Sequence, residues 1–159
     1  MAAFAPLHSA EWLAFTAVPP RLPLAHKWGG PLQSQSASLT FTGAGTGTAK
    51  MFRLPAGKVR VFPDLCRVVC PVGTATADLH IGTAAYTKED GSAGAADDNA
   101  FADNLDVGGG ALDQAWTAPA VGYLDLDSQN GIDVEVLIDT ASGPAAGEMF
   151  LSCVYQKGG

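Results

Sequence analysis

The sequence has 159 residues, a formal net charge of −7 and a sequence pI of about 4.6. This length allows one domain with a hydrophobic core, and the acidic balance argues against a nucleic-acid partner. Hydrophobic residues make up 47% of the chain and charged residues only 16%, yet no stretch is apolar for long enough to span a membrane. Such a low charge content suits a surface that neighbouring molecules partly cover.

The charges are distributed unequally along the chain. Residues 1–77 hold seven Lys+Arg and two Asp+Glu, a net charge of +5, whereas residues 78–159 hold two and fourteen, a net charge of −12. Two interpretations are open. Both halves intermix within one compact fold, or copies of the chain pack a basic edge against an acidic loop.

Residues 1–33 differ from the rest because they combine prolines with large aromatic side chains. Pro19, Pro20 and Pro23 favour an extended, polyproline-like chain. Left in water, the aromatic side chains would form an apolar patch of a size that soluble monomers avoid. We therefore expect an extended arm that packs on a neighbouring subunit or a larger assembly, not on its own domain. The expected anchors are Phe4, Trp12, Phe15 and Trp28.

The remaining residues, 34–159, show the two-residue period of β-strands. Between Gln33 and Thr42, larger side chains alternate with serine and threonine, and turns rich in glycine and proline separate such segments. This spacing predicts one antiparallel β-sandwich domain of about eight to ten short strands. The expected strands are 33–42, 49–54, 58–62, 65–70, 74–82, 111–115, 121–126, 132–138 and 148–156.

The stretch from Thr74 to Val107 joins a regular strand to an acidic segment. Ala77, Leu79 and Ile81 share one parity, which predicts their burial and places His80 on the polar face. Residues 88–107 are acidic and rich in small side chains, which favours a long irregular loop that makes contacts at the surface. The expected interface residues of this loop are Asp97, Asp98, Phe101 and Asp103.

No motif carries a catalytic signature. Gly43–Lys50 resembles a phosphate-binding loop, but Lys50 follows Ala49 instead of the last glycine. Asp125–Gly131 half-resembles a calcium loop, with its glycine one position late and Val136 at the twelfth position. The carboxylates show no obvious glycosidase pair. We predict a non-enzymatic protein without cofactor or metal; Ca²⁺ in the acidic segment is the open alternative.

The cysteines are expected to stay reduced. Cys66, Cys70 and Cys153 make an odd number, and the N-terminus lacks a secretion signal, which indicates a reducing compartment. Cys66 and Cys70 lie four positions apart on one expected strand, about 13 Å, so they are expected to fill the core as free thiols. The histidines share no ligand spacing and are expected at the surface: His8, His26 and His80.

Four segments of the body resemble small structural proteins of tailed-phage virions. The likeness covers about residues 45–156 and consists of soft β-sandwich patterns. The segments are Arg53–Val61, Ala75–Thr83, Asp90–Asp103 and Ala146–Tyr155.

This resemblance implies a capsid decoration, or cement, protein. Such proteins have a jelly-roll-like sandwich, often form trimers and clamp adjacent capsomers, and they supply no catalytic residues. The expected partners are therefore the major capsid protein and further copies of the chain in a homotrimer, on the outer capsid surface of a virion assembled in the host cytoplasm. A tail or neck component, or a carbohydrate-binding sandwich, is the alternative; the latter needs exposed aromatic side chains, and two of the three tryptophans lie in the arm.

Overall fold

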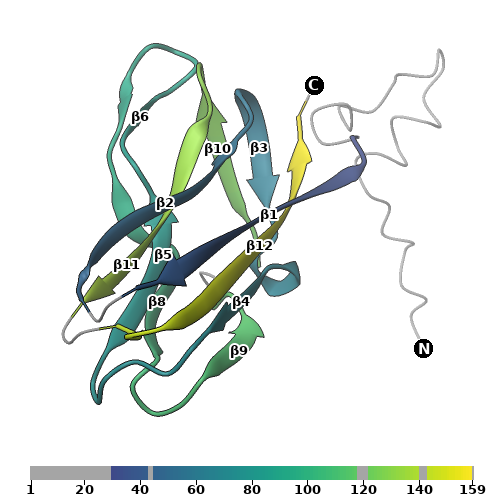
Figure 1. Ribbon diagram of the computed structural model, residues 1–159. Coiled ribbons are helices and arrows are strands. Elements are labelled where there is room, and N and C mark those ends of the chain that lie inside the picture. Colours follow the sequence, from purple (N-terminus) through teal and green to yellow (C-terminus); the bar gives the residue numbers. More distant parts are fainter. Residues whose placement is uncertain (1–29, 43–44, 118–121, 140–142, 159) are drawn as a thin grey trace, which may run out of the picture.

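The computed structural model describes residues 30–42, 45–117, 122–139 and 143–158, and these ranges form an all-β protein (Figure 1). They contain one short 3-10 turn, η2 (Pro63–Leu65), and no helix long and apolar enough to cross a membrane. The strands are β1 (Leu32–Phe41), β2 (Gly47–Leu54), β3 (Gly57–Val61), β4 (Arg67–Cys70), β5 (Asp78–Thr83), β6 (Tyr86–Thr87), β7 (Ala93–Gly94), β8 (Asp97–Asp106), β9 (Leu112–Ala115), β10 (Leu124–Ser128), β11 (Ile132–Asp139) and β12 (Gly147–Lys157).

The strands pair in a nested order. β1 pairs with β12, β2 with β11, β3 with β10, β4 with β9, β5 with β8 and β6 with β7, all antiparallel. The chain is therefore one long hairpin whose tip is the β6–β7 ribbon. This hairpin is rolled up so that β12 also pairs with β3 and β4, and β11 with β5. A rolled hairpin of this kind is a jelly roll.

Rolling produces two sheets that face each other. Sheet A has the order β10-β3-β12-β4-β9 with β1 along the other side of β12, and sheet B has the order β2-β11-β5-β8. Figure 1 shows β1 beside β12 in one layer, with β2, β11, β5 and β8 in the other. The expectation of an antiparallel, jelly-roll-like sandwich is confirmed.

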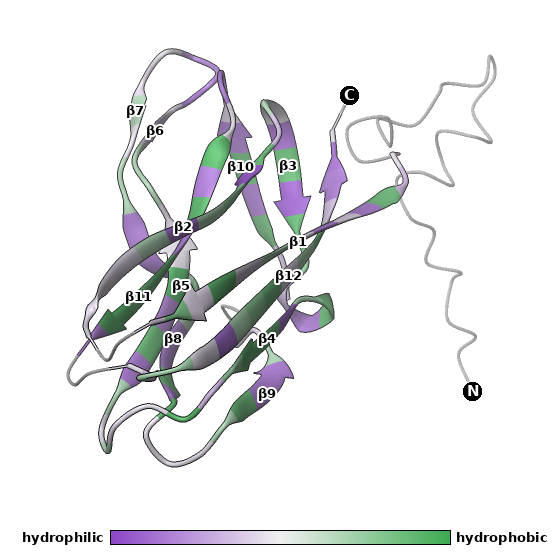
Figure 2. Cartoon of the chain, viewed as in Figure 1, coloured by the Kyte–Doolittle hydropathy of each residue, from purple (hydrophilic) through white to green (hydrophobic). Residues whose placement is uncertain are grey.

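The core lies between the two sheets and follows the two-residue period. Along β11 and β12 every second side chain is buried, and Figure 2 shows the matching alternation of hydrophobic and hydrophilic residues. The expected burial of Ala77, Leu79 and Ile81 is confirmed, because all three are fully buried. Cys66, Cys70 and Cys153 are free, buried thiols, as expected.

The acidic segment is not the long irregular loop that its composition indicates. Residues 86–94 form the hairpin tip, and residues 97–106 form strand β8 on the edge of sheet B. Asp, Asn and Ala favour strands poorly, but pairing with β5 and burial of Phe101, Ala102 and Leu105 impose a strand here. Two register irregularities break the alternation of β8, which removes the pattern that would have identified it.

Phe101 is a core residue, which corrects its expected place in an interface. Its side chain is fully buried and its ring centroid lies 5.3 Å from that of Trp116. Edge-tilted aromatic pairs at this separation are favourable. Trp116 is 1% exposed, and together the two rings fill the core where β8 passes the end of β9.

We expect Phe101→Ala to lower the free energy of unfolding by about 3–5 kcal/mol, because it removes a fully buried aromatic side chain and leaves a cavity. Phe150→Ala is the matched control: Phe150 lies on β12 and is 41% exposed, so its loss should cost less than about 1 kcal/mol. Urea unfolding followed by circular dichroism measures both. Equal effects of the two substitutions would contradict the placement of Phe101 in the core.

Candidate contact surface

The part of the chain that the structure describes offers no group of three or more His, Cys, Asp or Glu side chains arranged to hold a metal ion. Asp125 and Asp127, which half-resembled a calcium loop, lie on strand β10, and Asp125 binds the guanidinium of Arg60. The surfaces of the sandwich are the remaining candidate sites of function. The expected arm anchors lie outside the described residues: Phe4, Trp12, Phe15 and Trp28.

The fold brings basic side chains of the first half of the chain next to acidic side chains of the second half. Among the described residues, each Lys or Arg side chain in the ion pairs below comes from the first half of the chain, and its carboxylate partner comes from the second half. This supports the interpretation in which both halves intermix in one domain, and these cations are not free to bind an acidic loop of another copy. The pairs are Lys50–Asp133 (2.9 Å), Arg53–Asp133 (2.5 Å), Arg60–Asp125 (2.6 Å) and Arg67–Asp113 (2.8 Å).

Asp133 and Arg60 are the most heavily engaged of these groups. Hydrogen bonds from Arg53 and Lys50 hold the pKa of the Asp133 carboxyl well below its usual range. Arg60 donates two hydrogen bonds to Asp125, and its guanidinium carbon lies 4.1 Å from the centre of the Tyr123 ring. One face of this exposed aromatic ring is therefore covered by the Arg60 guanidinium.

His80 is a bridge between strands instead of an exposed polar residue. Its side chain is 10% exposed; Nδ1 lies 2.9 Å from an oxygen of Asp103 on β8, and Nε2 lies 3.1 Å from one of Asp139 on β11. Carboxylates only accept, so an imidazole that donates to both carries two protons. The Asn104 amide lies 3.5 Å from Nδ1, and the shorter Asp103 contact determines the role of that nitrogen.

The environment of His80 favours the protonated ring. Burial lowers the pKa of His80, but the hydrogen bonds and charges of Asp139 and Asp103 outweigh burial and raise it above 6.5. No local pattern in the sequence predicts this bridge, because the three residues lie on three different strands. Asp103, expected in an interface, is thus partly engaged in holding β8 to β5.

Asp97 and Asp98 stay available at the surface. Both are exposed at the start of β8, which is the outer edge of sheet B. With Asp103 and Asp106 they make this edge acidic. Charged residues along an edge strand hinder pairing with the strands of another molecule.

The opposite side of the sandwich is different, because its edge strand β1 carries no charge. β1 is ten residues long, has the sequence LQSQSASLTF and pairs in unbroken register with β12; no other described strand pairs with it. The other edge strands of the two sheets all carry charged side chains: Lys50 and Arg53 on β2, the aspartates of β8, Asp113 on β9, and Asp125 and Asp127 on β10. An uncharged edge without proline or bulge is the kind that accepts another strand.

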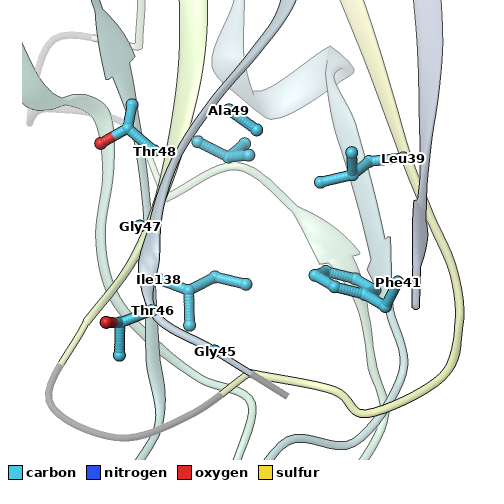
Figure 3. A pocket seen from close by; sticks show the side chains of 9 residues that line it. Leu39, Phe41, Gly45, Thr46, Gly47, Thr48, Ala49 and Ile138 are labelled. Atoms are coloured by element: carbon cyan, nitrogen blue, oxygen red, sulfur yellow. The ribbon is translucent and has the colours of Figure 1, made fainter. Parts of the chain in front are cut away.

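An apolar groove of about 230 Å³ lies beside this edge, where the two sheets meet. Val136 and Ile138 of β11, both buried, line one side of the groove. Figure 3 shows Leu39 and Phe41 of β1 across the groove from Ile138. Ala49 of β2 completes the apolar lining. We call β1 together with this groove the open side. It combines a strand edge that no other described strand pairs with and an apolar recess, which suits an extended segment bearing large apolar side chains.

No protein-family model and no curated protein matches the sequence. Among solved structures, a chain in the capsid asymmetric unit of cyanophage Pam1 is similar, with a TM-score of 0.54 and 15% identity over 99% of this chain and 94% of that chain. A chain in the acid-stable capsid of Helicobacter pylori bacteriophage KHP30 gives a TM-score of 0.42 at 18% identity, over 79% of this chain and 93% of that one. The Pam1 likeness shows a shared fold over nearly the whole chain.

The His80 bridge makes stability depend on pH in a defined direction. Because the pKa is raised in the folded state, the contribution is fully present below about pH 6.5, the ordinary pKa, and is lost as pH rises through the folded-state pKa. The two carboxylates are about half exposed, so solvent screening limits the contribution to about 1 kcal/mol.

We expect His80→Gln to lower the free energy of unfolding by this amount at pH 5.5 and by clearly less at pH 9. Urea titrations of both proteins at the two pH values measure the difference. The same loss at both pH values would show that His80 acts through packing alone.

Proposed function

We propose that this chain is a non-enzymatic structural protein of a phage virion, a decoration or cement protein that binds the outer capsid surface between capsomers and stabilises the head. The similarity to a chain of the Pam1 capsid along nearly the full length of both is the observation that carries the proposal. The surfaces described above agree with it, since they offer an edge and a groove for contact instead of a catalytic site.

The open side is proposed to receive residues 1–29 of a neighbouring copy. This segment precedes Gly30, which is fixed to the body by a hydrogen bond from Gln156 to its carbonyl oxygen. A segment of 29 residues spans up to about 95 Å when extended, enough to cross from one copy to the next. Its aromatic side chains, Trp12 and Trp28 above all, match the apolar recess, and burying each stabilises the contact by about 2–3 kcal/mol.

This arm exchange supplies the proposed homotrimer. If each copy passes its arm to the next in the same direction, the contact is head to tail, and a threefold rotation closes it into a ring. The basic side chains of the first half pair with carboxylates of the same chain, so they are not proposed to join neighbouring copies. The arm is proposed to make that contact instead.

The acidic edge is proposed to face the major capsid protein. Asp97, Asp98 and Asp103 lie on β8, and the strand order of sheet B places β8 at the edge opposite β2 and thus away from the open side. A basic patch on the shell would complement them. Many identical contacts over a shell add up to firm attachment even if each is weak.

The direct test is binding of the purified protein to capsids that lack it. We expect saturable binding to shells, a higher temperature of shell disruption when it is bound, and loss of binding when residues 2–29 are deleted, although the truncated protein stays folded by circular dichroism. The deletion should also convert the trimer to a monomer in sedimentation. Binding to purified tails or to a glycan array, without binding to shells, would replace the proposed function by the corresponding alternative.

A point substitution separates the open side from the arm itself. We expect Leu39→Asp to lower trimer affinity at least tenfold, because it places a carboxylate in the apolar groove, the equivalent of about 1.4 kcal/mol or more. Thr40→Asp adds the same charge one position further on the same strand, where the side chain points away from the groove, and serves as the control. Equal affinity of the two variants would exclude the groove as the acceptor.

A further inference from the structure

Two of the three buried cysteines face each other across sheet A. β12 pairs with β4 so that Leu151 lies opposite Val68 and Ser152 opposite Arg67. The next position in this register brings Cys153 opposite Cys66, which has an extended backbone at the end of η2. Both side chains point into the core and are 0% and 1% exposed. The two residues are thus cross-strand neighbours on one face, although they are far apart in sequence.

The backbone of Cys66 defines the kind of pair that they form. Its N–H donates to Pro63 O, and its carbonyl oxygen accepts from Trp116 N–H on the side of β9. Neither group is therefore bonded to Cys153, so this is a non-hydrogen-bonded antiparallel pair. In such pairs the Cα atoms are about 4.5 Å apart, within the range of about 4.4–6.8 Å that disulfides span.

The thiols also interact with each other. The Cys66 sulfur accepts a hydrogen bond from the Cys153 thiol and another from the Val154 amide at 3.1 Å, and the Cys66 thiol donates to the Phe62 carbonyl oxygen at 3.2 Å. The hydrogen bond from Cys153 lowers the pKa of the Cys66 thiol, whereas burial raises the pKa of Cys70 to about 11. Cys66 is therefore favoured over Cys70 to ionise and to act as the attacking sulfur.

We propose that Cys66 and Cys153 are an oxidation site that forms an intramolecular disulfide on exposure to a disulfide oxidant such as oxidised glutathione. The Cys66 thiolate attacks one sulfur of oxidised glutathione and releases a glutathione thiolate. The hydrogen bond with Cys66 and burial raise the pKa of Cys153, so this thiol gives its proton to the first released glutathione thiolate as its sulfur attacks the Cys66 sulfur of the mixed disulfide and releases the second glutathione thiolate. Two electrons pass from the cysteines to glutathione, and the two thiol protons end on the two released glutathione molecules.

The cross-link would join β12 to the start of β4. It closes a long loop, residues 66 to 153, in the unfolded chain, and loops of this length give large stabilisation. When the disulfide would form in nature depends on the proposed function. A virion that leaves the reducing cytoplasm at lysis enters an oxidising medium, where the cross-link could form. The chemistry itself depends only on the fold.

Cys70 supplies the internal control. It is as buried as Cys153, but the same register places Met149 opposite it, and Met149 has no thiol to oxidise. A disulfide to Cys70 would require the strands to slip. Cys70→Ser should therefore leave the cross-link intact, and Cys153→Ala should abolish it.

The experiment is refolding of the full chain from urea in oxidised or in reduced glutathione, followed by denaturation, thiol titration and mass mapping of peptides. The expected oxidised product has lost two hydrogen atoms, titrates one thiol instead of three, and yields a peptide that joins residues 66 and 153. Its melting temperature should exceed that of the reduced protein by about 10 °C.

Three titratable thiols after oxidation, or a cross-link that includes Cys70, would overturn the proposal. Peptide mapping of the wild-type chain gives this answer even if a cysteine variant fails to fold. Neither result bears on capsid binding, so failure here leaves the proposed function untouched, and the reverse also holds.

Discussion

The last strand, β12, holds this molecule together because it pairs with three strands of the first half of the chain: β1, β3 and β4. β12 pairs with β1 along ten residues on one side, and with β3 and β4 in succession on the other. Its buried side chains, Met149, Leu151, Cys153 and Tyr155, alternate along the middle of sheet A. Sheet A is complete only after Lys157 has paired with Val59, 98 positions earlier in the chain. Contacts between residues so far apart in sequence are expected to make folding slow. The open side likewise exists only after this closure.

Nested pairing also explains why the first half of the chain is basic and the second acidic. Strands of the first half meet strands of the second half in the ladders β2–β11, β3–β10 and β4–β9, and each of these ladders carries an ion pair on its outer face. Arg53 lies directly opposite Asp133, and Arg60 directly opposite Asp125. Exposed pairs add little stability, but opposite charges placed face to face favour one register over slipped ones. The unequal distribution of charge along the sequence thus agrees with a rolled hairpin, in which basic strands of the first half pair with acidic strands of the second half.

The sequence was sufficient where a strand has one buried and one exposed face. The strands 33–42, 58–62, 132–138 and 148–156 were predicted to within a residue or two of β1, β3, β11 and β12 because the alternation is regular there. The sequence was insufficient where contacts with distant strands determine the structure of a segment. β8 is acidic and bulged, and only its pairing with β5 makes it a strand. His80 followed the correct parity, but its burial depends on aspartates 23 and 59 positions away. The facing of Cys66 and Cys153 required the register of two distant strands.

The two sides of the sandwich show that charge is placed along its edges selectively. β2, β8, β9 and β10 carry Lys, Arg or Asp, as edge strands do when pairing with other molecules must be avoided. β1 is as long as β8 and has serine, threonine or glutamine at six positions where a charged side chain would have been tolerated, yet it carries no charge. A single lysine would have protected it at negligible cost to the core, because no residue of β1 is fully buried. An edge left uncharged under these conditions, next to an apolar groove, is better explained by a strand that binds there than by chance composition.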